Sequence, residues 1–211
     1  MIEIVRRGVC LVLCAPSGGG KGAITQRLLA REPALRLSVS VTTRAPRPQE
    51  VDGVHYRFIT PEAFAAAQRD GELLEWARVL GGTHAYGTPR GPVEAALTAG
   101  EDMIFDIDWQ GFRQLRQHMP DDVVGIFILP PTLDVLEQRL RDRAGESGPE
   151  IDRRMRVARE EISHWREFDH VVVNDVLDQA VEQVDSILRA ARLTTRRRTG
   201  LEQFTAKLLG P

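Results

Sequence analysis

Short apolar runs alternate along this chain with segments in which apolar residues recur every three or four positions. The runs are typical of buried strands, and the spaced pattern is typical of amphipathic helices. Because strands separated by helices pair in parallel, the alternation predicts an α/β fold. Its mostly parallel sheet would be flanked by helices, with ligands at the carboxyl ends of the strands. The expected strands are residues 9–13, 37–41, 103–107, 123–129 and 171–173, and the expected helices are residues 21–31, 89–99, 132–143, 150–166 and 176–193.

Two segments interrupt this alternation. Residues 42–88 are richer in Thr, Pro, Gly and aromatic residues, with short strand candidates at 56–59 and 73–79. We interpret them as a subdomain inserted into the core. Residues 141–152 are polar and contain Gly and Pro between two predicted helices, a composition that suits a mobile lid.

The C-terminal segment carries three consecutive arginines, Arg196 to Arg198, followed by apolar residues at helical spacing. Leu201, Phe204 and Leu208 predict a small amphipathic helix that packs on the core or on a partner. We expect the arginines to form a solvated face rather than a nucleic-acid patch.

The composition is that of an ordinary globular chain. With 211 residues, 42% of them hydrophobic and 27% charged, the chain is long enough for one compact α/β core with small insertions. The net charge of −2 gives no overall attraction to nucleic acid, so anion binding must come from local arginine clusters. No apolar stretch approaches the roughly 20 residues that cross a bilayer, and residues 1–7 lack a signal-peptide layout. We therefore expect a cytoplasmic protein without a membrane partner.

Neither the cysteines nor the histidines predict a metal or disulfide site. Cys10 and Cys14 lie on one predicted strand, where they cannot reach each other at disulfide distance. We expect them to be small core residues. The five histidines are scattered without ligand or triad spacing and are expected to be structural or surface residues.

A glycine-rich turn follows the first predicted strand and opens the first predicted helix. Residues 15–21 read Ala-Pro-Ser-Gly-Gly-Gly-Lys, and Lys21 is one of only two lysines in a chain with 26 arginines. Backbone N–H groups of such a turn point inward at phosphate, and the lysine adds a compact positive charge. Ala15 stands where the P-loop pattern has glycine, and Gly22 stands where it has Ser or Thr. A glycine-rich turn with an incidental lysine is therefore the alternative.

Two further clusters have the chemistry of a phosphate site. Asp106 and Asp108 end an apolar run and lie two positions apart, hence on one face at the carboxyl end of a strand. P-loop enzymes keep there the acid that holds Mg²⁺ or its waters, whereas a helix cap is the structural alternative for Asp108. Arg44 and Arg47 lie on a proline-stiffened loop whose guanidinium forks suit phosphate, with two surface arginines as the alternative.

The order of these segments resembles the guanylate kinase family, from about residue 8 to about residue 193. Matching stretches are residues 38–47, 50–56, 86–88, 106–111 and 173–175. The resemblance implies transfer of the γ-phosphate of ATP to GMP or dGMP, with Mg²⁺ as cofactor. It implies one domain of residues 1–211, made of a core (1–36, 89–140 and 153–193), a GMP-binding subdomain (37–88), a lid (141–152) and a tail (194–211).

The resemblance also assigns roles to individual residues. It implies that the GMP-binding residues are Ser40, Arg44, Arg47, Tyr56 and Tyr86 at the phosphate, with Glu75, Thr88 and Asp108 at the guanine. It implies that the ATP-binding residues are Ala15, Pro16, Ser17, Gly18, Gly19, Gly20, Lys21, Gly22, Ala23 and Asn174, the last of them near the adenine. The implied catalytic residues are Lys21, Arg44, Arg139, Arg143 and Arg154, and the implied metal-site residue is Asp106, acting through water. Without the resemblance, the three arginines flanking the lid would be interpreted as helix-surface residues.

Some positions depart from the family's pattern. Gly22 and Ala23 replace Ser or Thr residues, one of which supplies a hydroxyl to Mg²⁺, so weaker metal binding or slower turnover is expected. Ala85 replaces a frequent tyrosine, and the loop over residues 80–84 is longer than usual, with His84 expected at its surface.

Three other interpretations compete with a guanylate kinase. They are a related binding module that has lost catalysis, a P-loop kinase for another phosphorylated acceptor, and RNA binding through the C-terminal arginines. Retention of Lys21, Asp106 and the arginines argues against the first. Glu75 with Thr88 and Asp108 argues for guanine over other acceptors. No nucleic-acid partner is expected, and the sequence does not predict the oligomeric state.

Overall fold

The larger of two sheets is built from five parallel strands, as the alternating pattern predicts. The structure is a computed structural model that describes residues 4–79, 83–144 and 148–210. The strand order is β2-β7-β1-β8-β9, and every neighbouring pair is parallel. The strands are β1 (Cys10–Cys14), β2 (Leu35–Leu37), β7 (Asp102–Asp106), β8 (Val123–Leu129) and β9 (His170–Val173).

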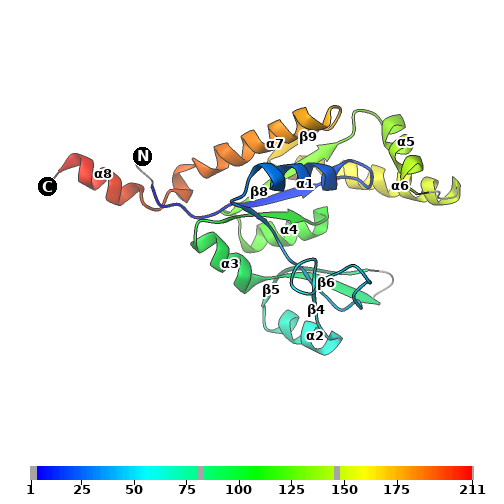
Figure 1. Cartoon of the computed structure of the whole chain (residues 1–211), viewed down its shortest axis with the longest axis horizontal. Coiled ribbons are helices and arrows are strands. Elements are labelled where there is room, and N and C mark those ends of the chain that lie inside the picture. The colour runs from blue at the N-terminus through cyan, green and yellow to red at the C-terminus, as the bar shows by residue number, and fades with distance from the viewer. Residues whose placement is uncertain (1–3, 80–82, 145–147, 211) are drawn as a thin grey trace.

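Helices cover both faces of this sheet (Figure 1). Buried residues of α1 (Lys21–Arg31) and α7 (Leu177–Arg192) pack on one face, and those of α3 (Arg90–Thr98) and α4 (Trp109–His118) pack on the other. Because strand residues alternate between faces, β1 divides its side chains between the two cores. Cys10 and Cys14 belong to the α3–α4 core as buried free thiols, which confirms the prediction from sequence.

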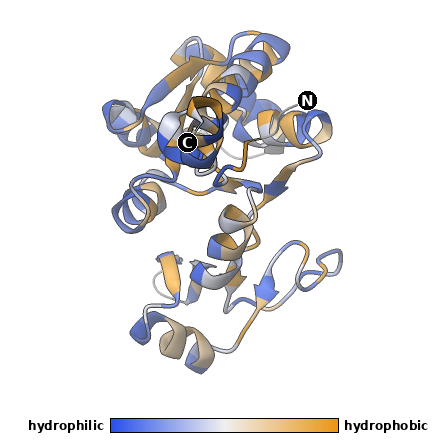
Figure 2. Cartoon of the chain, turned by 90° about the vertical axis from the view of Figure 1, so that its left-hand side faces the viewer, coloured by the Kyte–Doolittle hydropathy of each residue, from blue (hydrophilic) through white to orange (hydrophobic). Residues whose placement is uncertain are grey.

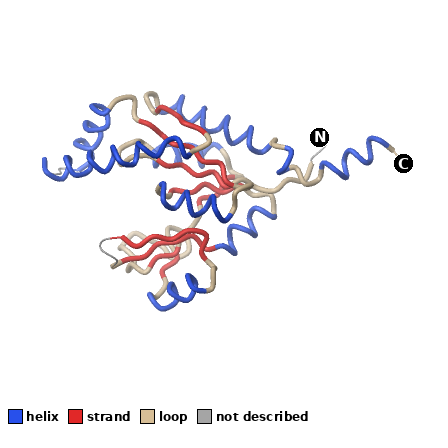
Figure 3. Tube along the Cα trace, turned by 180° about the vertical axis from the view of Figure 1, so that it is seen from behind, coloured by secondary structure: helices blue, strands red, loops and turns tan. Residues whose placement is uncertain are grey.

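A second, four-stranded sheet with the order β4-β3-β6-β5 forms a smaller body (Figure 3). This body stands apart from the core in the side view of Figure 2. Gln114 of α4 joins the two bodies, because its side chain accepts from the backbone N–H of Trp76 at 3.1 Å and donates to the Trp76 carbonyl at 3.0 Å. The elements of this body are β3 (Val41–Thr42), β4 (Arg57–Phe58), α2 (Pro61–Arg69), β5 (Leu73–Val79) and β6 (His84–Pro89).

The predicted strand over residues 37–41 is wrong. The chain forms β2, which ends at Leu37 beside β7, and then crosses to the second sheet, where β3 begins at Val41. Residues 38–40 belong to neither strand. Alternating apolar residues continue through this crossing, so the pattern alone does not mark the point at which the chain changes sheets.

Two helices extend into the predicted lid from either side. They are α5 (Leu133–Ala144) and α6 (Gly148–Ser163), and residues 145–147 between them lie outside the described residues. A 3₁₀ turn, η1 (His164–Glu167), follows α6 and leads to β9.

The C-terminal helix forms as predicted but does not pack on the core. It is α8 (Leu201–Leu209), has no buried residue, and extends away from the rest of the chain (Figure 1). Within the described ranges, no helix has the length and apolarity needed to cross a membrane.

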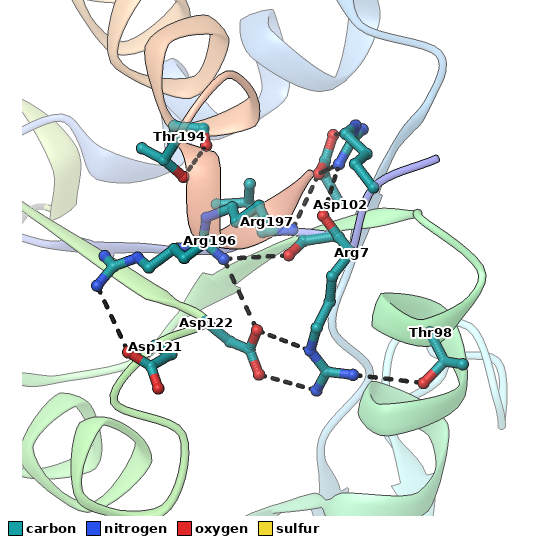
Figure 4. A network of polar contacts seen from close by, with 12 residues as sticks. Arg7, Thr98, Asp102, Asp121, Asp122, Thr194, Arg196 and Arg197 are labelled. Atoms are coloured by element: carbon teal, nitrogen blue, oxygen red, sulfur yellow. Dashed lines mark hydrogen bonds and ion pairs between the residues drawn. The ribbon is translucent and has the colours of Figure 1, made fainter. Parts of the chain in front are cut away.

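The prediction that the three C-terminal arginines form a solvated face is wrong for the middle one. The turn η2 (Thr195–Arg197) points Arg197 into the amino end of the sheet, where it is buried (Figure 4). Its Nη1 donates to the carbonyl of Gly8 at 3.2 Å and lies 3.7 Å from a carboxylate oxygen of Asp122. Arg196 stays exposed, 3.5 Å from Asp121.

A second ionic cluster lies at this same end of the sheet, on Asp102. The carboxylate of Asp102 is fully buried and accepts two hydrogen bonds from Arg6, at 2.6 and 2.8 Å. It also accepts from Nε of Arg192 at 2.8 Å and from the backbone N–H of Val9 at 2.9 Å. These contacts tie the segment before β1 and the end of α7 to β7, at the amino end of the strands, opposite the end that carries the glycine-rich turn.

Candidate functional site

The glycine-rich turn connects the carboxyl end of β1 to the first residue of α1. Gly18 and Gly20 adopt positive φ angles of 88° and 96°, which side-chain-bearing residues rarely adopt. Gly20 is the N-cap of α1, and because it has no side chain it offers no cap acceptor to the first N–H groups of this helix. A helix start of this kind binds anions because its N–H groups and its dipole both favour negative charge.

Lys21 reaches from the start of α1 to the end of β7. Its Nζ lies 2.5 Å from Oδ1 of Asp106 and donates to the carbonyl of Ile107 at 3.1 Å. The sheet register creates this meeting, because Leu13 of β1 pairs beside Asp106 of β7. The lysine and the acid that sequence patterns proposed separately therefore lie in direct contact.

Arg44 is held in place by several partners in the smaller body. Its Nε donates to the hydroxyl of Tyr86 at 3.1 Å, and its guanidinium carbon lies 5.3 Å from the ring centre of Tyr56. Nη1 and Nη2 each donate to one carboxylate oxygen of Glu50 at 2.8 Å. Arg44, together with the backbone N–H of Arg47, lowers the pKa of Glu50 to about 2. The aromatic rings and Glu50 thus hold the guanidinium group of Arg44 in one orientation within the smaller body.

A buried acid lies where the smaller body meets α4. Glu75 of β5 accepts a hydrogen bond from the hydroxyl of Thr88 at 2.6 Å. Burial raises the pKa of Glu75 to about 7. The hydrogen bond from Thr88 lowers this pKa, and the negative charge of Asp108 raises it. A side chain at Gly111 would place its Cβ 3.0 Å from Oε2 of Glu75, so the glycine leaves room for this carboxylate.

Asp108 has the capping role that sequence analysis kept as its alternative. It is the N-cap of α4, and its Oδ1 accepts from the backbone N–H of Gly111 at 2.8 Å. One carboxylate oxygen serves this cap, and the second oxygen is available for another partner.

A cavity of about 120 Å³ between the two bodies gathers residues from both. Among its lining residues are the candidates Ser40, Tyr56, Thr88 and Asp106. A larger cavity of about 500 Å³ lies beside Arg36 and Pro92 and contains none of the candidate side chains, so size alone does not locate the site. The smaller cavity connects the Lys21–Asp106 pair to the residues around Arg44 and Glu75.

The arginines near the predicted lid differ in how the structure places them. Arg139 of α5 donates from Nη2 to the carbonyl of Asn174 at 3.0 Å, close to the glycine-rich turn. Arg154 of α6 forms an ion pair with Glu150 on the same helix, with Nε 3.6 Å from Oε1. The side chain of Arg143 lies outside the described residues.

Two acids in the site were not among the sequence candidates. Glu50 binds Arg44, and Glu161 of α6 accepts from the backbone N–H of Ser17 at 3.2 Å. Burial raises the pKa of Glu161. Neither acid follows a strand or a motif, so the only signal in the sequence for Glu50 is its position within the stretch 50–56.

The donor set around Asp106 fits a metal ion that is shared with a phosphate ligand. In the part of the chain that the structure describes, no three His, Cys, Asp or Glu residues are grouped to hold a metal alone. Asp106 offers one half-exposed carboxylate beside Lys21. A divalent ion that keeps its waters needs only one or two protein carboxylates once phosphate oxygens complete its coordination.

Comparisons with known proteins show the family of this chain. A family model described as guanylate kinase matches residues 7–191. The chain is 58% identical over 206 residues to a curated guanylate kinase of Gluconobacter oxydans, with 98% of each chain covered, and 56% identical to one of Granulibacter bethesdensis, with 98% of this chain and 95% of the relative covered. The crystal structure of guanylate kinase from Anaplasma phagocytophilum matches with a TM-score of 0.74 at 34% identity, covering 95% of this chain and 94% of that one. The chain belongs to the guanylate kinase family.

Proposed function

We propose that this protein transfers the γ-phosphate of ATP to GMP or dGMP. One observation carries the proposal: the Lys21–Asp106 contact joins the glycine-rich turn to the cavity lined by Ser40, Tyr56 and Thr88. A phosphate donor on the turn and a nucleotide acceptor in the cavity would then meet at Asp106. The family of the chain supports the same reaction.

Glu75 is proposed to select guanine through its carboxylate. Guanine presents N1–H and an exocyclic amine on one edge, and one carboxylate accepts from both. Adenine presents a bare nitrogen lone pair at that position, which repels the carboxylate and leaves its Oε2 without a donor in a buried site. Thr88 holds Glu75 in position through its hydroxyl hydrogen bond. The oxygen of Asp108 that does not cap α4 is proposed as a further hydrogen-bond acceptor for guanine.

The phosphate of GMP is proposed to bind against Arg44, Arg47, Ser40 and the hydroxyls of Tyr56 and Tyr86. Arg44 is oriented before any ligand arrives, because Glu50 and Tyr86 already bind its fork. A preoriented guanidinium loses less side-chain entropy when phosphate binds.

Catalysis in this site would be mainly electrostatic. Two phosphate groups must approach each other, so the barrier falls when fixed positive charge surrounds them in a closed site. We propose that Lys21 and the N-terminus of α1 supply this charge at the donor, and that Arg139, Arg143 and Arg154 add it when residues 141–152 close. No general base is needed, because the acceptor phosphate is itself the nucleophile.

Mg²⁺ is the metal proposed for the Asp106 position. It favours oxygen ligands and retains water, which matches a single carboxylate acting beside phosphate oxygens. When bound, Mg²⁺ would neutralise charge on the ATP phosphates. Gly22 and Ala23 cannot supply the hydroxyl that the P-loop pattern implies at this position, so water would take that place.

The reaction is tested by following ADP formation from ATP and Mg²⁺ with GMP, with dGMP, with AMP and without an acceptor. We expect ADP with GMP and dGMP and little with the other two mixtures. Equal rates with AMP would show that the acceptor pocket does not select guanine. No ADP formation with any acceptor would favour a binding module that has lost catalysis.

Replacing Glu75 with Gln should relax the preference for guanine more than it weakens binding of ATP. The amide keeps the size of the side chain but repels guanine N–H groups with its own N–H₂, which corresponds to about a 10- to 100-fold lower kcat/KM ratio of GMP to AMP. Steady-state kinetics with both acceptors measures this ratio, with Glu72→Gln on the exposed residue before β5 as the control. An unchanged ratio in Glu75→Gln would remove Glu75 from base recognition.

The affinity for GMP should fall as the pH drops below about 7, the pKa to which burial raises the Glu75 carboxyl. Below that pH the free protein holds Glu75 protonated, and the proton must leave before the carboxylate accepts two N–H groups. The KM for GMP should therefore rise by about tenfold per pH unit below 7 and stay level above it. The GMP phosphate titrates in the same region, so Glu75→Gln serves as the control that retains only the ligand's contribution. The same pH profile in both proteins would contradict the assignment.

Replacing Gly22 with Ser should lower the Mg²⁺ concentration needed for half-maximal activity. A Cβ at Gly22 would have nothing within 4 Å, so the side chain fits without displacing a neighbour. The new hydroxyl would supply one ligand or hydrogen bond near the metal, equivalent to about a 2- to 10-fold change in concentration. Gly22→Ala adds the same Cβ without the oxygen and should leave the Mg²⁺ requirement unchanged. A similar shift in both variants would assign the effect to helix stability instead.

A further inference from the structure

Asn174 occupies a fixed position directly after β9. Its backbone N–H donates to the carbonyl of Leu129 at the end of β8, at 2.8 Å. Only 4% of the residue is exposed, so the side chain is enclosed rather than presented to solvent. The end of the sheet therefore determines where this amide lies.

The side-chain amide of Asn174 binds the glycine-rich turn. Its Nδ2 donates to the carbonyl of Gly19 at 2.9 Å in a buried contact. The orientation of the amide follows from this partner, since an amide oxygen facing a carbonyl would be repelled. A Cβ at Gly20 would lie only 2.1 Å from Nδ2, so the amide packs directly against the turn at the point where α1 begins.

This hydrogen bond fixes the direction of one peptide group in the turn. In a trans peptide the carbonyl and the following N–H point in opposite directions. With the Gly19 carbonyl held on Asn174, the N–H of Gly20 is directed away from Asn174. The peptide between Gly19 and Gly20 would otherwise rotate with little steric resistance, because both residues are glycines and Gly20 already adopts a positive φ.

The backbone of Asn174 also positions an arginine. Its carbonyl accepts from Nη2 of Arg139 at 3.0 Å. Arg139 lies on α5, next to Leu136 and Leu140, which a side chain at Gly18 would contact. One residue at the end of β9 thus contacts both the turn and a guanidinium group beside it.

We propose that Asn174 is a positioning residue of the ATP phosphate site, acting through the Gly19 carbonyl and through Arg139. This inference rests on the proposed function, because it takes the turn to be the site of the ATP phosphates. It assigns the side chain of Asn174 to positioning the turn that holds the phosphates, whereas the family resemblance places this residue near the adenine. Loss of the amide would free the peptide between Gly19 and Gly20 and weaken binding of the polyphosphate chain.

The test is binding of tripolyphosphate, which carries the phosphates of ATP without its base. Isothermal titration of Asn174→Ala should give about tenfold weaker tripolyphosphate binding than the unmodified protein, the loss of one buried hydrogen bond. The KM for ATP should rise by a similar factor, and the KM for GMP should not change. Val173→Ala, on the exposed preceding residue, should behave like the unmodified protein.

Other outcomes separate the inference from its alternatives. Unchanged tripolyphosphate affinity with a raised KM for ATP would assign Asn174 to the adenine and overturn the inference. Equal increases in both KM values would indicate a general structural role and would also overturn it. If Asn174→Ala does not fold, Asn174→Asp keeps the shape of the side chain and removes its N–H donor. Unchanged tripolyphosphate binding by Asn174→Asp would also overturn the inference. An unmodified protein that forms no ADP with GMP would instead defeat the proposed function.

Discussion

Replacing Lys21 with Met is expected to lower kcat by about 10²- to 10³-fold, the effect of removing one fixed charge from a transition state. Methionine keeps much of the length of the side chain and removes its ammonium group. Lys21 lies between the glycine-rich turn and Asp106, so its charge acts where the two phosphates would meet. Compensation from another lysine is excluded, because the only other one is Lys207 in the exposed helix α8.

Lys207→Met is the matched control for this experiment, since it makes the same substitution at an exposed residue of α8, the helix that extends away from the rest of the chain (Figure 1). Steady-state kinetics with saturating GMP and ATP measures kcat for both variants, and circular dichroism checks that they fold. Asp106 is half exposed, so water can solvate it once Lys21 is removed, and only a small loss of stability is expected. Equal kcat values in the two variants would show that Lys21 is an incidental residue of the turn.

Replacing Asp102 with Asn is expected to lower the free energy of unfolding by about 3–5 kcal/mol, the range for breaking a buried ion pair. The carboxylate is fully buried and receives four hydrogen bonds, three of them from Arg6 and Arg192. The asparagine has one acceptor oxygen and directs its N–H₂ group at donors. In a chain of this size the loss corresponds to a fall in Tm on the order of 10 °C.

Denaturant titration of Asp102→Asn measures this loss, with Asp121→Asn as the control. Asp121 pairs with Arg196 at 3.5 Å, but its side chain is 83% exposed, so its removal should change stability by less than about 0.5 kcal/mol. Equal stability in the two variants would mean that the Asp102 cluster contributes no more than a surface ion pair. Because the cluster lies at the opposite end of the sheet from Lys21, KM values should stay unchanged.

The core of the fold could be predicted because its strands carry a strong local signal. Strands β1, β7 and β8 are buried on both faces, and their uninterrupted apolar runs stand out from the polar segments around them. The sequence pattern missed α2, which is short, although Thr60 caps it and Pro61 occupies its first position. These two residues are a start signal that could have identified the helix.

Burial of Arg197 could not be read from the sequence. Three consecutive arginines are ordinarily a solvated face, and the partners of the buried one, Gly8 and Asp122, lie far away along the chain. Glu161 is a similar case, since its contact with Ser17 depends on how α6 folds back beside the turn. The sequence gives the charged residues, whereas tertiary packing decides which of them are buried and which partners they contact.

Asp108 shows how two interpretations of one residue can coexist. Its position before α4 predicts a helix cap, and the structure places it there. Its Oδ1 binds the N–H of Gly111, and a Cβ at Gly111 would lie 3.0 Å from Oε2 of Glu75, so the same carboxylate lies close to the proposed guanine pocket. One oxygen is used by the cap, so a second role needs only the other oxygen.

The central claim is that the glycine-rich turn and the cavity between the two bodies form one site for phosphoryl transfer to GMP. Phosphorus NMR of the protein with ATP, Mg²⁺ and GMP tests it most directly, because it identifies which molecule receives the phosphate. We predict that the signals of GDP and ADP grow together while those of ATP and GMP decline. Growth of inorganic phosphate with no GDP would contradict the claim.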